Sequence, residues 1–306
     1  MNTHVTTPQD VEITLTTGDG HPLHGTLTLP DGLGPHPAVL CLPGSGKVDR
    51  DSNAGRVRME LGGPLAHALA RQGIASLRYD RRGVGASPGD WRAAGFVDNR
   101  DDAAMALRTL RARPEVKADK VGVVGHSEGA VHAMWLGSHE NPAAVVLLAG
   151  YARPGGEALR WQASRVAGTV PAFVRPLLPL LGRVATRQLT ALENTTTDVA
   201  RVGGAKVNAR WWREQLAHDP RADLPGITAP VLALTGDKDL QVDAADLEVV
   251  RSLVPGAETR CVPGLTHLLR VDPDEPKLTS YGRLLRRPVD PGLLAEVADW
   301  LAQRLR

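Results

Sequence analysis

Two kinds of hydrophobic pattern follow one another along this chain, and each predicts a different kind of strand. Residues Val11–Thr17 and Leu23–Leu29 alternate apolar and polar positions on either side of a glycine-containing turn, which predicts an antiparallel hairpin with one face in water. Short predicted strands come next, and several of them are apolar runs without alternation, as expected for strands that are buried on both faces. These strands are Ala38–Leu42, Ile74–Tyr79, Val121–Val124, Ala143–Leu148, Val231–Leu234 and Thr259–Val262.

Helical periodicity separates these runs, so strands and helices alternate through most of the chain. The predicted helices are Glu60–Gln72, Asp98–Arg113, Glu128–Ser138, Ala244–Leu253 and Pro291–Leu305. This alternation predicts an α/β fold, in which a mostly parallel eight-stranded sheet has an N-terminal antiparallel hairpin and helices on both faces. We therefore assign residues 1–150 and 226–306 to one core domain.

One long segment, residues 151–225, breaks the alternation. It has no good strand and three helical runs, Glu157–Val166, Ala172–Leu192 and Asn208–Ala217. A simple crossover needs far fewer residues, so the segment is an insertion. Its leucines and its two adjacent tryptophans need a partner surface, which favours a helical cap packed over the sheet. A helix lying in a membrane interface is the alternative.

Composition and charge exclude several classes of protein. Of the 306 residues, 42% are hydrophobic and 23% charged, which excludes wholesale disorder. Lys and Arg number 36 against 34 Asp and Glu, with no basic tract, so we expect no nucleic-acid partner. No apolar stretch reaches the ~20 residues that a membrane span needs. The N-terminus lacks the pattern of a signal peptide, so we expect a soluble, cytoplasmic protein.

The two cysteines, Cys41 and Cys261, each lie in an apolar, strand-like run. Two thiols cannot build a disulfide framework or a four-thiolate zinc site. We expect both to be small buried hydrophobic residues. Nothing in the chain specifies an oligomeric state.

The segment Gly125–Gly129 fits the pattern G-x-S-x-G, with a buried strand before it and a helix after it. This context forms a sharp turn that exposes the serine hydroxyl above the carboxyl ends of the strands. Glycines on either side let the backbone cross closely, and the helix N-terminus favours developing negative charge. Ser127 is therefore the predicted nucleophile of an acyl-transfer reaction.

A serine nucleophile needs a base, and the base needs an acid to orient it. In this kind of fold the acid precedes the histidine along the chain. Asp237 and Asp239 lie directly after one predicted strand, and His267 lies in the loop after the next. The other nine histidines fit less well, because they lie in the N-terminal hairpin, on helices, in the insertion or inside the turn itself. His267 is the predicted base, and Asp237 or Asp239 is the acid.

An oxyanion hole needs two backbone N–H donors. Glu128, the residue after the nucleophile, supplies one of them, and Ser45 supplies the other because glycines on both sides free its N–H to turn inward. A plain Pro-Gly turn is the alternative for this loop. The Glu128 side chain has two interpretations: a carboxylate favoured by the helix dipole, or a group that projects into the cleft and disfavours anionic acyl groups.

Three other patterns fail as cofactor or metal sites. Gly44–Lys47 lacks the first glycine and the hydroxyl residue of a phosphate loop. Gly83–Gly85 lacks the third glycine of a dinucleotide loop and the helix that must follow. His132 and His139, with Glu140, lack the i, i+4 spacing of a zinc helix. The chemistry therefore requires no cofactor and no metal.

Five parts of the chain together resemble the α/β-hydrolase superfamily, close to its serine esterase and serine-aminopeptidase-like branches. They are LPGSG at Leu42–Gly46, RYDRRGVGAS at Arg78–Ser87, GHSEG at Gly125–Gly129, TGDKD at Thr235–Asp239, and His267. The resemblance implies a cap at the insertion, and it implies that Asp239 rather than Asp237 is the acid. Pro43 departs from the pattern, because many relatives carry His before the oxyanion glycine.

These residues predict a serine hydrolase that cleaves a carboxylic ester, or a related acyl bond, through an acyl-enzyme. The expected partner is a small-molecule acyl substrate. The same triad also serves peptidases, amidases, thioesterases, enzymes that break carbon–carbon bonds, and acyltransferases. A non-catalytic binding protein on this fold is the alternative from another class.

Overall fold

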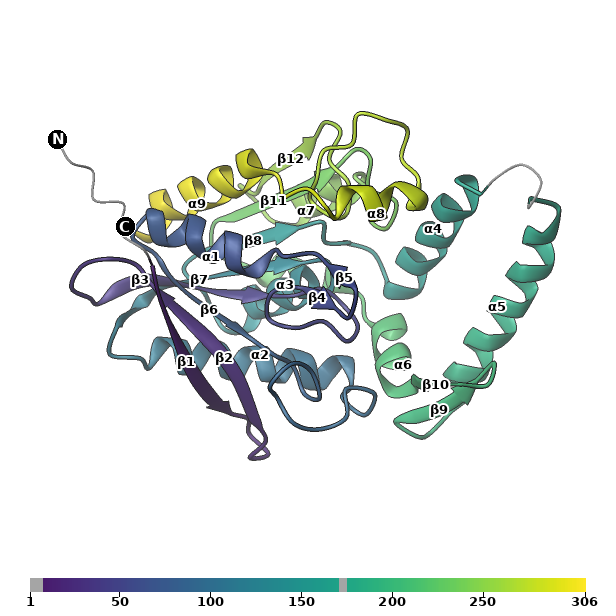
Figure 1. The fold of residues 1–306 in the computed structure, drawn as a ribbon, viewed down its shortest axis with the longest axis horizontal. Helices are drawn as coiled ribbons and strands as arrows, with labels where there is room; N and C mark the ends of the chain where they lie inside the picture. The colour runs from purple at the N-terminus through teal and green to yellow at the C-terminus, as the bar shows by residue number, and fades with distance from the viewer. Residues whose placement is uncertain (1–7, 171–174) are drawn as a thin grey trace.

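The computed structural model describes residues 8–170 and 175–306, and its centre is one eight-stranded sheet (Figure 1). The strand order is β1-β2-β6-β3-β7-β8-β11-β12. β1 is antiparallel to β2 and β2 to β6, and every later pair is parallel, which confirms the predicted sheet. The strands are β1 Gln9–Thr16, β2 Pro22–Leu29, β3 His36–Leu42, β6 Ala75–Tyr79, β7 Val116–His126, β8 Val145–Leu148, β11 Val231–Gly236 and β12 Glu258–Val262.

Helices cover both faces of this sheet. α1 (Gly62–Arg71) and α9 (Pro291–Leu305) pack on one face, and α2 (Phe96–Arg111), α3 (Glu128–His139) and α7 (Asp246–Leu253) pack on the other. β8 shows why a strand that is covered on both faces has an unbroken run of apolar residues in the sequence. Its first and third residues belong to the core beneath α2 and α3, and its second and fourth belong to the core beneath α1 and α9.

The remaining elements of the described chain outside residues 151–225 are short. They are β4 Asn53–Ala54, β5 Val57–Arg58, α8 Tyr281–Leu284 and a 3₁₀ turn at Leu278–Ser280. Of the helices within residues 8–170 and 175–306, none is both long and apolar enough to cross a membrane.

The two cysteines differ in exposure, so one of the two burial predictions was wrong. Cys41 is buried in β3, in the middle of the sheet, whereas Cys261 is exposed on β12. β12 is an edge strand with a single neighbour, and its side chains are only partly covered. An apolar run in the sequence does not distinguish an edge strand from a central one.

The parallel strands set the position of the candidate chemistry. β3, β7, β11 and β12 all run in the same direction, so their carboxyl ends meet at one edge of the sheet. The loops that leave this edge carry Ser45, Ser127, Asp239 and His267. Clefts at the carboxyl ends of strands are where open α/β sheets bind ligands.

Residues 151–225 contribute no strand to the large sheet. Their elements are α4 Gly155–Gly168, a 3₁₀ turn Arg175–Leu177, α5 Leu178–Glu193, β9 Val199–Val202, β10 Ala205–Asn208, α6 Ala209–Ala217, and two 3₁₀ turns, Pro220–Ala222 and Leu224–Gly226. The expectation that this segment has no strand was wrong. Gly203 and Gly204 both have positive φ, which suits the two-residue turn that joins β9 to β10.

The helices of this segment differ in how they pack. α6 contacts α2 and α4, whereas α5 stands away from the sheet in Figure 1 and is buried only at Leu192. The leucine cluster was expected to pack over the sheet, but Leu177, Leu180 and Leu181 are exposed. The predicted helix Ala172–Leu192 begins within 171–174, which lies outside the described residues.

Candidate active site

Ser127 occupies a strained turn between β7 and α3. Its φ of 56° lies in the left-handed region that a residue with a side chain rarely adopts. The flanking glycines are required by space. A Cβ atom on Gly125 would lie 2.0 Å from the carbonyl oxygen of Gly129, and one on Gly129 would lie 2.3 Å from that of Leu42. This packing fixes the serine at the edge of the sheet.

A chain of two hydrogen bonds connects Ser127 to His267 and Asp239. Ser127 Oγ lies 3.1 Å from His267 Nε2, and His267 Nδ1 lies 2.8 Å from Asp239 Oδ2. A carboxylate only accepts, so Nδ1 carries the imidazole proton and Nε2 is free to accept from the serine hydroxyl. The other oxygen of Asp239 accepts from the backbone N–H groups of Gln241 and Val242, at 2.7 and 2.9 Å. The carboxylate is therefore held in one orientation.

The two candidate carboxylates have different surroundings. Asp239 is buried beside His267, whereas Asp237 is exposed. Asp237 Oδ1 accepts from the backbone N–H of Gly264 at 2.6 Å and so connects the loops after β11 and β12. The structure brings Asp239, and not Asp237, into contact with the histidine.

His126, inside the turn, supports the loop that carries His267. Its Nε2 donates to the carbonyl oxygen of His267 at 3.0 Å. Burial, together with the nearby His267 imidazole, lowers the pKa of His126 to about 3. His126 is therefore neutral at ordinary pH, with its proton on the nitrogen that faces this carbonyl.

Ser45 and the N-terminal end of α3 lie around the same nucleophile. A Cβ on Gly44 would lie 3.4 Å from Ser127 Cβ, so the loop after β3 packs directly against the serine. In the part of the chain that is described, neither the Ser45 N–H nor the Glu128 N–H has a hydrogen-bond acceptor. Both residues line the cavity that also contains Ser127.

The Glu128 side chain is buried and carries a fully paired charge. Its Oε1 accepts from Arg81 Nη1 at 2.8 Å, Asn99 Nδ2 at 3.2 Å and His132 Nε2 at 3.1 Å. Its Oε2 accepts from Trp211 Nε1 of α6 at 3.1 Å. Burial alone would raise the pKa of Glu128, but the Arg81 charge and the hydrogen bonds from His132 and Trp211 lower it to about 2.

Neither sequence interpretation of Glu128 included its partner, Arg81. The signal available in the sequence was the run of three charged residues, Asp80 to Arg82, directly after the buried strand β6. All three are engaged. Asp80 accepts from Arg50, Arg81 pairs with Glu128, and Arg82 pairs with Asp19 and Asp102. A charged residue that is buried at the end of a strand needs a partner of opposite charge. Charged residues directly after a buried strand are therefore candidates for buried ion pairs.

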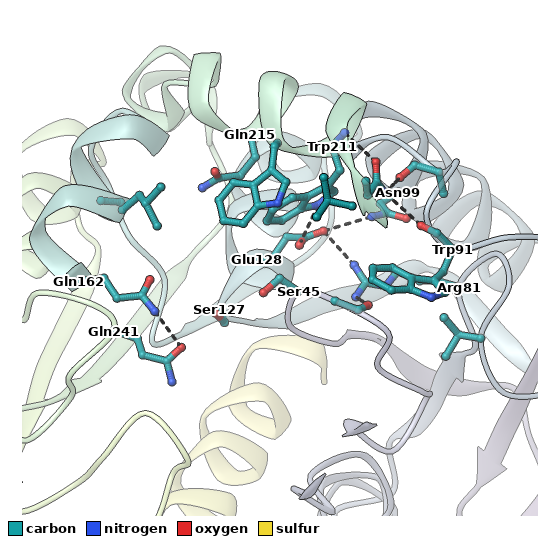
Figure 2. Close-up of a pocket in the computed structure, with 18 of the residues that line it drawn as sticks. Ser45, Arg81, Trp91, Asn99, Ser127, Glu128, Gln162, Trp211, Gln215 and Gln241 are labelled. Atoms are coloured by element: carbon teal, nitrogen blue, oxygen red, sulfur yellow. Dashed lines mark hydrogen bonds and ion pairs between the residues drawn. The ribbon is translucent and has the colours of Figure 1, made fainter. Parts of the chain in front are cut away.

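A cavity of about 390 Å³ opens above Ser127 (Figure 2). Its floor includes Ser45, Ser127 and Glu128, and its other walls come largely from α4, β10 and α6. Four aromatic side chains line it: Trp91, Tyr151, Trp211 and Trp212. Aromatic side chains beside polar groups are typical of small-molecule sites.

The described residues contain no group of three or more His, Cys, Asp or Glu side chains arranged to hold a metal ion. The histidines and the glutamate of the rejected pattern have separate contacts. His132 donates to Glu128, His139 stacks on Trp135, and Glu140 pairs with Arg108.

The pKa of Glu128 predicts how acid affects stability. A carboxylate whose folded-state pKa is lowered stabilises the protein fully above its unfolded pKa, near 4.5, and loses that contribution as the pH falls towards about 2. Glu128→Gln breaks a buried ion pair and should lower the free energy of unfolding at pH 7 by about 3–5 kcal/mol. This difference from wild type should shrink at pH 3, as measured by urea unfolding.

The control for this experiment is Glu248→Gln, which removes an exposed pair with Arg251. It should change the free energy of unfolding little at either pH, since exposed pairs contribute about 0–1 kcal/mol. A Glu128→Gln difference of the same size at pH 7 and pH 3 would contradict the assigned pKa.

Comparisons with known proteins agree with this fold. Esterase EstD of Thermotoga maritima is 27% identical over 285 residues, which cover 92% of this chain and 66% of EstD. The chain thus spans slightly less than two thirds of that relative. The crystal structure of the α/β-hydrolase GrgF from Penicillium sp. sh18 has a TM-score of 0.64 at 19% identity and covers 98% of this chain and 99% of GrgF.

Est1E from Butyrivibrio proteoclasticus, solved with ferulic acid bound, has a TM-score of 0.62 at 16% identity and covers 95% of this chain and 96% of that one. At these identities, the solved structures show a shared fold. A family model described as serine aminopeptidase, S33, matches residues 60–274. Because that match covers well over half of the chain, the protein belongs to the serine aminopeptidase S33 family of α/β-hydrolases.

Proposed function

We propose that this protein is a serine hydrolase that cleaves a carboxylic ester through an acyl-enzyme. The observation that carries the proposal is the hydrogen-bonded chain from Ser127 Oγ through His267 to Asp239, beside a cavity of about 390 Å³. Similarity to an esterase over 92% of the chain supports an ester as the substrate. The family membership supports hydrolysis in general.

Acylation begins with attack of Ser127 Oγ on the ester carbonyl carbon. His267 Nε2 takes the hydroxyl proton, and the buried Asp239 carboxylate stabilises the imidazolium that forms. The carbonyl oxygen becomes an oxyanion, which the N–H groups of Ser45 and Glu128 bind. The carbon–oxygen bond to the alcohol then breaks, and His267 gives its proton to the departing alkoxide.

Deacylation repeats these steps with water as the nucleophile. His267 takes a proton from the water as its oxygen attacks the acyl carbon of the Ser127 ester. The same two N–H groups bind the second oxyanion, and the intermediate collapses to release the carboxylic acid. His267 returns the proton to Ser127 Oγ, so the enzyme is regenerated.

Residues 151–225 form the cap of the proposed site, with 1–150 and 226–306 as the core. The support is their share of the cavity wall, to which α6 contributes Trp211 and Trp212. A lid of this kind excludes water during acylation and so strengthens the contacts with the oxyanion. Leu178 lies beside the exposed leucines at the start of α5 and is not among the residues that line the cavity.

Amide hydrolysis is the second candidate, because the matched family is described as a serine aminopeptidase. It uses the same groups and differs in that His267 must protonate an amine as it leaves. Parallel assays with p-nitrophenyl esters and aminoacyl p-nitroanilides separate the two activities. Faster turnover of the anilides would overturn the assignment of an ester as the substrate.

The acid of the triad is tested by a matched pair of substitutions. Asp239→Asn should lower kcat on p-nitrophenyl butyrate by about 10⁴-fold, because the amide favours the wrong tautomer of His267. Asp237→Asn should lower it by less than about 10-fold, because the exposed Asp237 carboxylate accepts from the Gly264 backbone at the neighbouring loop and not from His267. A larger loss for Asp237→Asn than for Asp239→Asn would show that the acid has been misassigned.

The cap is tested through acyl-chain preference. Trp212→Ala removes an aromatic side chain from the wall of the cavity. The ratio of kcat/KM for p-nitrophenyl octanoate to that for the acetate should therefore change by a factor that corresponds to about 1–3 kcal/mol of transition-state free energy. Trp161→Ala is the matched control. It removes a tryptophan of the same segment that does not line the cavity, and it should leave this ratio unchanged. If both substitutions slowed all esters equally, the segment would have a purely structural role.

A further inference from the structure

Arg81 connects the two loops that carry the proposed oxyanion donors. It follows β6, and its side chain is only 5% exposed. Nη2 donates to the carbonyl oxygens of Gly44 and Gly46, and Nη1 donates to Glu128 Oε1 at 2.8 Å. One guanidinium therefore contacts both the loop after β3 and the first residue of α3. Figure 2 shows Arg81 beside Ser45 and Glu128 on the floor of the cavity.

The contact with Gly44 determines the direction of the Ser45 N–H. The Gly44 carbonyl and the Ser45 N–H belong to one planar, trans peptide group, in which C=O and N–H point in opposite directions. When Arg81 holds the carbonyl, the N–H has to point away from the guanidinium. That N–H has no acceptor among the described residues, and its residue lines the cavity with Ser127.

A second contact, with Gly46, ties the other side of the same loop to Arg81. Gly46 has a φ of 91°, and its carbonyl oxygen accepts from the same nitrogen, Nη2, at 2.9 Å. Two carbonyls of the loop thus converge on one donor group, and Ser45 lies between them. A flip of the Gly44–Ser45 peptide would break the contact between Arg81 and the Gly44 carbonyl.

The contact with Glu128 extends the same unit to α3. The Glu128 carboxylate is held by Arg81 on Oε1 and by Trp211 on Oε2, so the first residue of the helix has little freedom. A lysine would supply the charge for this pair. It would not supply the planar fork of N–H groups that reaches Gly44, Gly46 and Glu128 together.

We propose that Arg81 is a positioning residue for the oxyanion hole. Its guanidinium holds the Gly44–Ser45 peptide and Glu128 in a fixed relation, so that the two N–H groups act on one oxyanion. This inference rests on the ester hydrolysis proposed above and adds a residue that acts through the Gly44–Ser45 peptide and Glu128. It predicts that the loss of Arg81 affects the transition state more than substrate binding.

The test measures kcat and KM on p-nitrophenyl butyrate for Arg81→Lys and Arg81→Ala in the full chain. Removing one oxyanion donor costs on the order of 10²–10³ in kcat. Misplacing a donor should cost about 10- to 100-fold in both variants, while KM changes by less than about threefold. Guanidinium chloride at non-denaturing concentrations should restore part of kcat to Arg81→Ala and should not raise that of wild type.

The matched control is Arg78→Met. Arg78 is also a buried arginine, on β6 itself, and it pairs with Asp51 and Asp10 away from the cavity. This substitution should lower the Tm and leave kcat within about threefold of wild type. A general loss of stability therefore gives a different result from a displaced oxyanion hole.

Two outcomes overturn the inference alone. One is an Arg81→Lys enzyme with the kcat of wild type; this variant decides the matter if Arg81→Ala does not fold. The other is a loss confined to KM. By contrast, a wild-type chain that hydrolyses no ester, or a Ser127→Ala variant with full activity, would overturn the proposed function itself.

Discussion

The turn from β7 into α3 is packed so closely, on itself and against the end of β3, that no side chain fits at position 125 or 129. This single constraint connects three parts of the site. It forces the strained backbone of Ser127, places the N-terminus of α3 behind the serine, and brings the loop with Ser45 against the serine. The position of the nucleophile is therefore set by backbone packing.

Buried charge gives the same region a second constraint. The Arg81–Glu128 pair lies beneath the cavity, and α6 contributes Trp211 to the same carboxylate. Breaking such a pair leaves an uncompensated charge in a medium of low polarity, which is costly. The segment 151–225 is thus connected to the first residue of α3 by a specific polar contact as well as by packing. Its outer helix, α5, has no comparable contact and is exposed along most of its length.

The sheet and the Ser127, Asp239 and His267 positions could be predicted because each depends on local sequence: an apolar strand, then a polar loop residue at its carboxyl end. The choice of Asp239 over Asp237 needed the family resemblance, because both follow the same strand. Arg81 was missed because its partners are 35 to 47 residues away along the chain. The β9–β10 hairpin was missed although its Gly-Gly turn is visible, and the exposure of Cys261 depends on strand order, which no local pattern contains.

The most direct test of this account is a covalent one. A fluorophosphonate should react once with each chain, and mass spectrometry of the digested protein should locate the adduct on Ser127 Oγ. The reaction requires a nucleophile activated by His267 and an oxyanion site for the phosphoryl oxygen, so it reports both parts of the mechanism. Ser127→Ala should form no adduct. An adduct on another residue, or an active esterase that forms none, would contradict the assignment of Ser127 as the nucleophile.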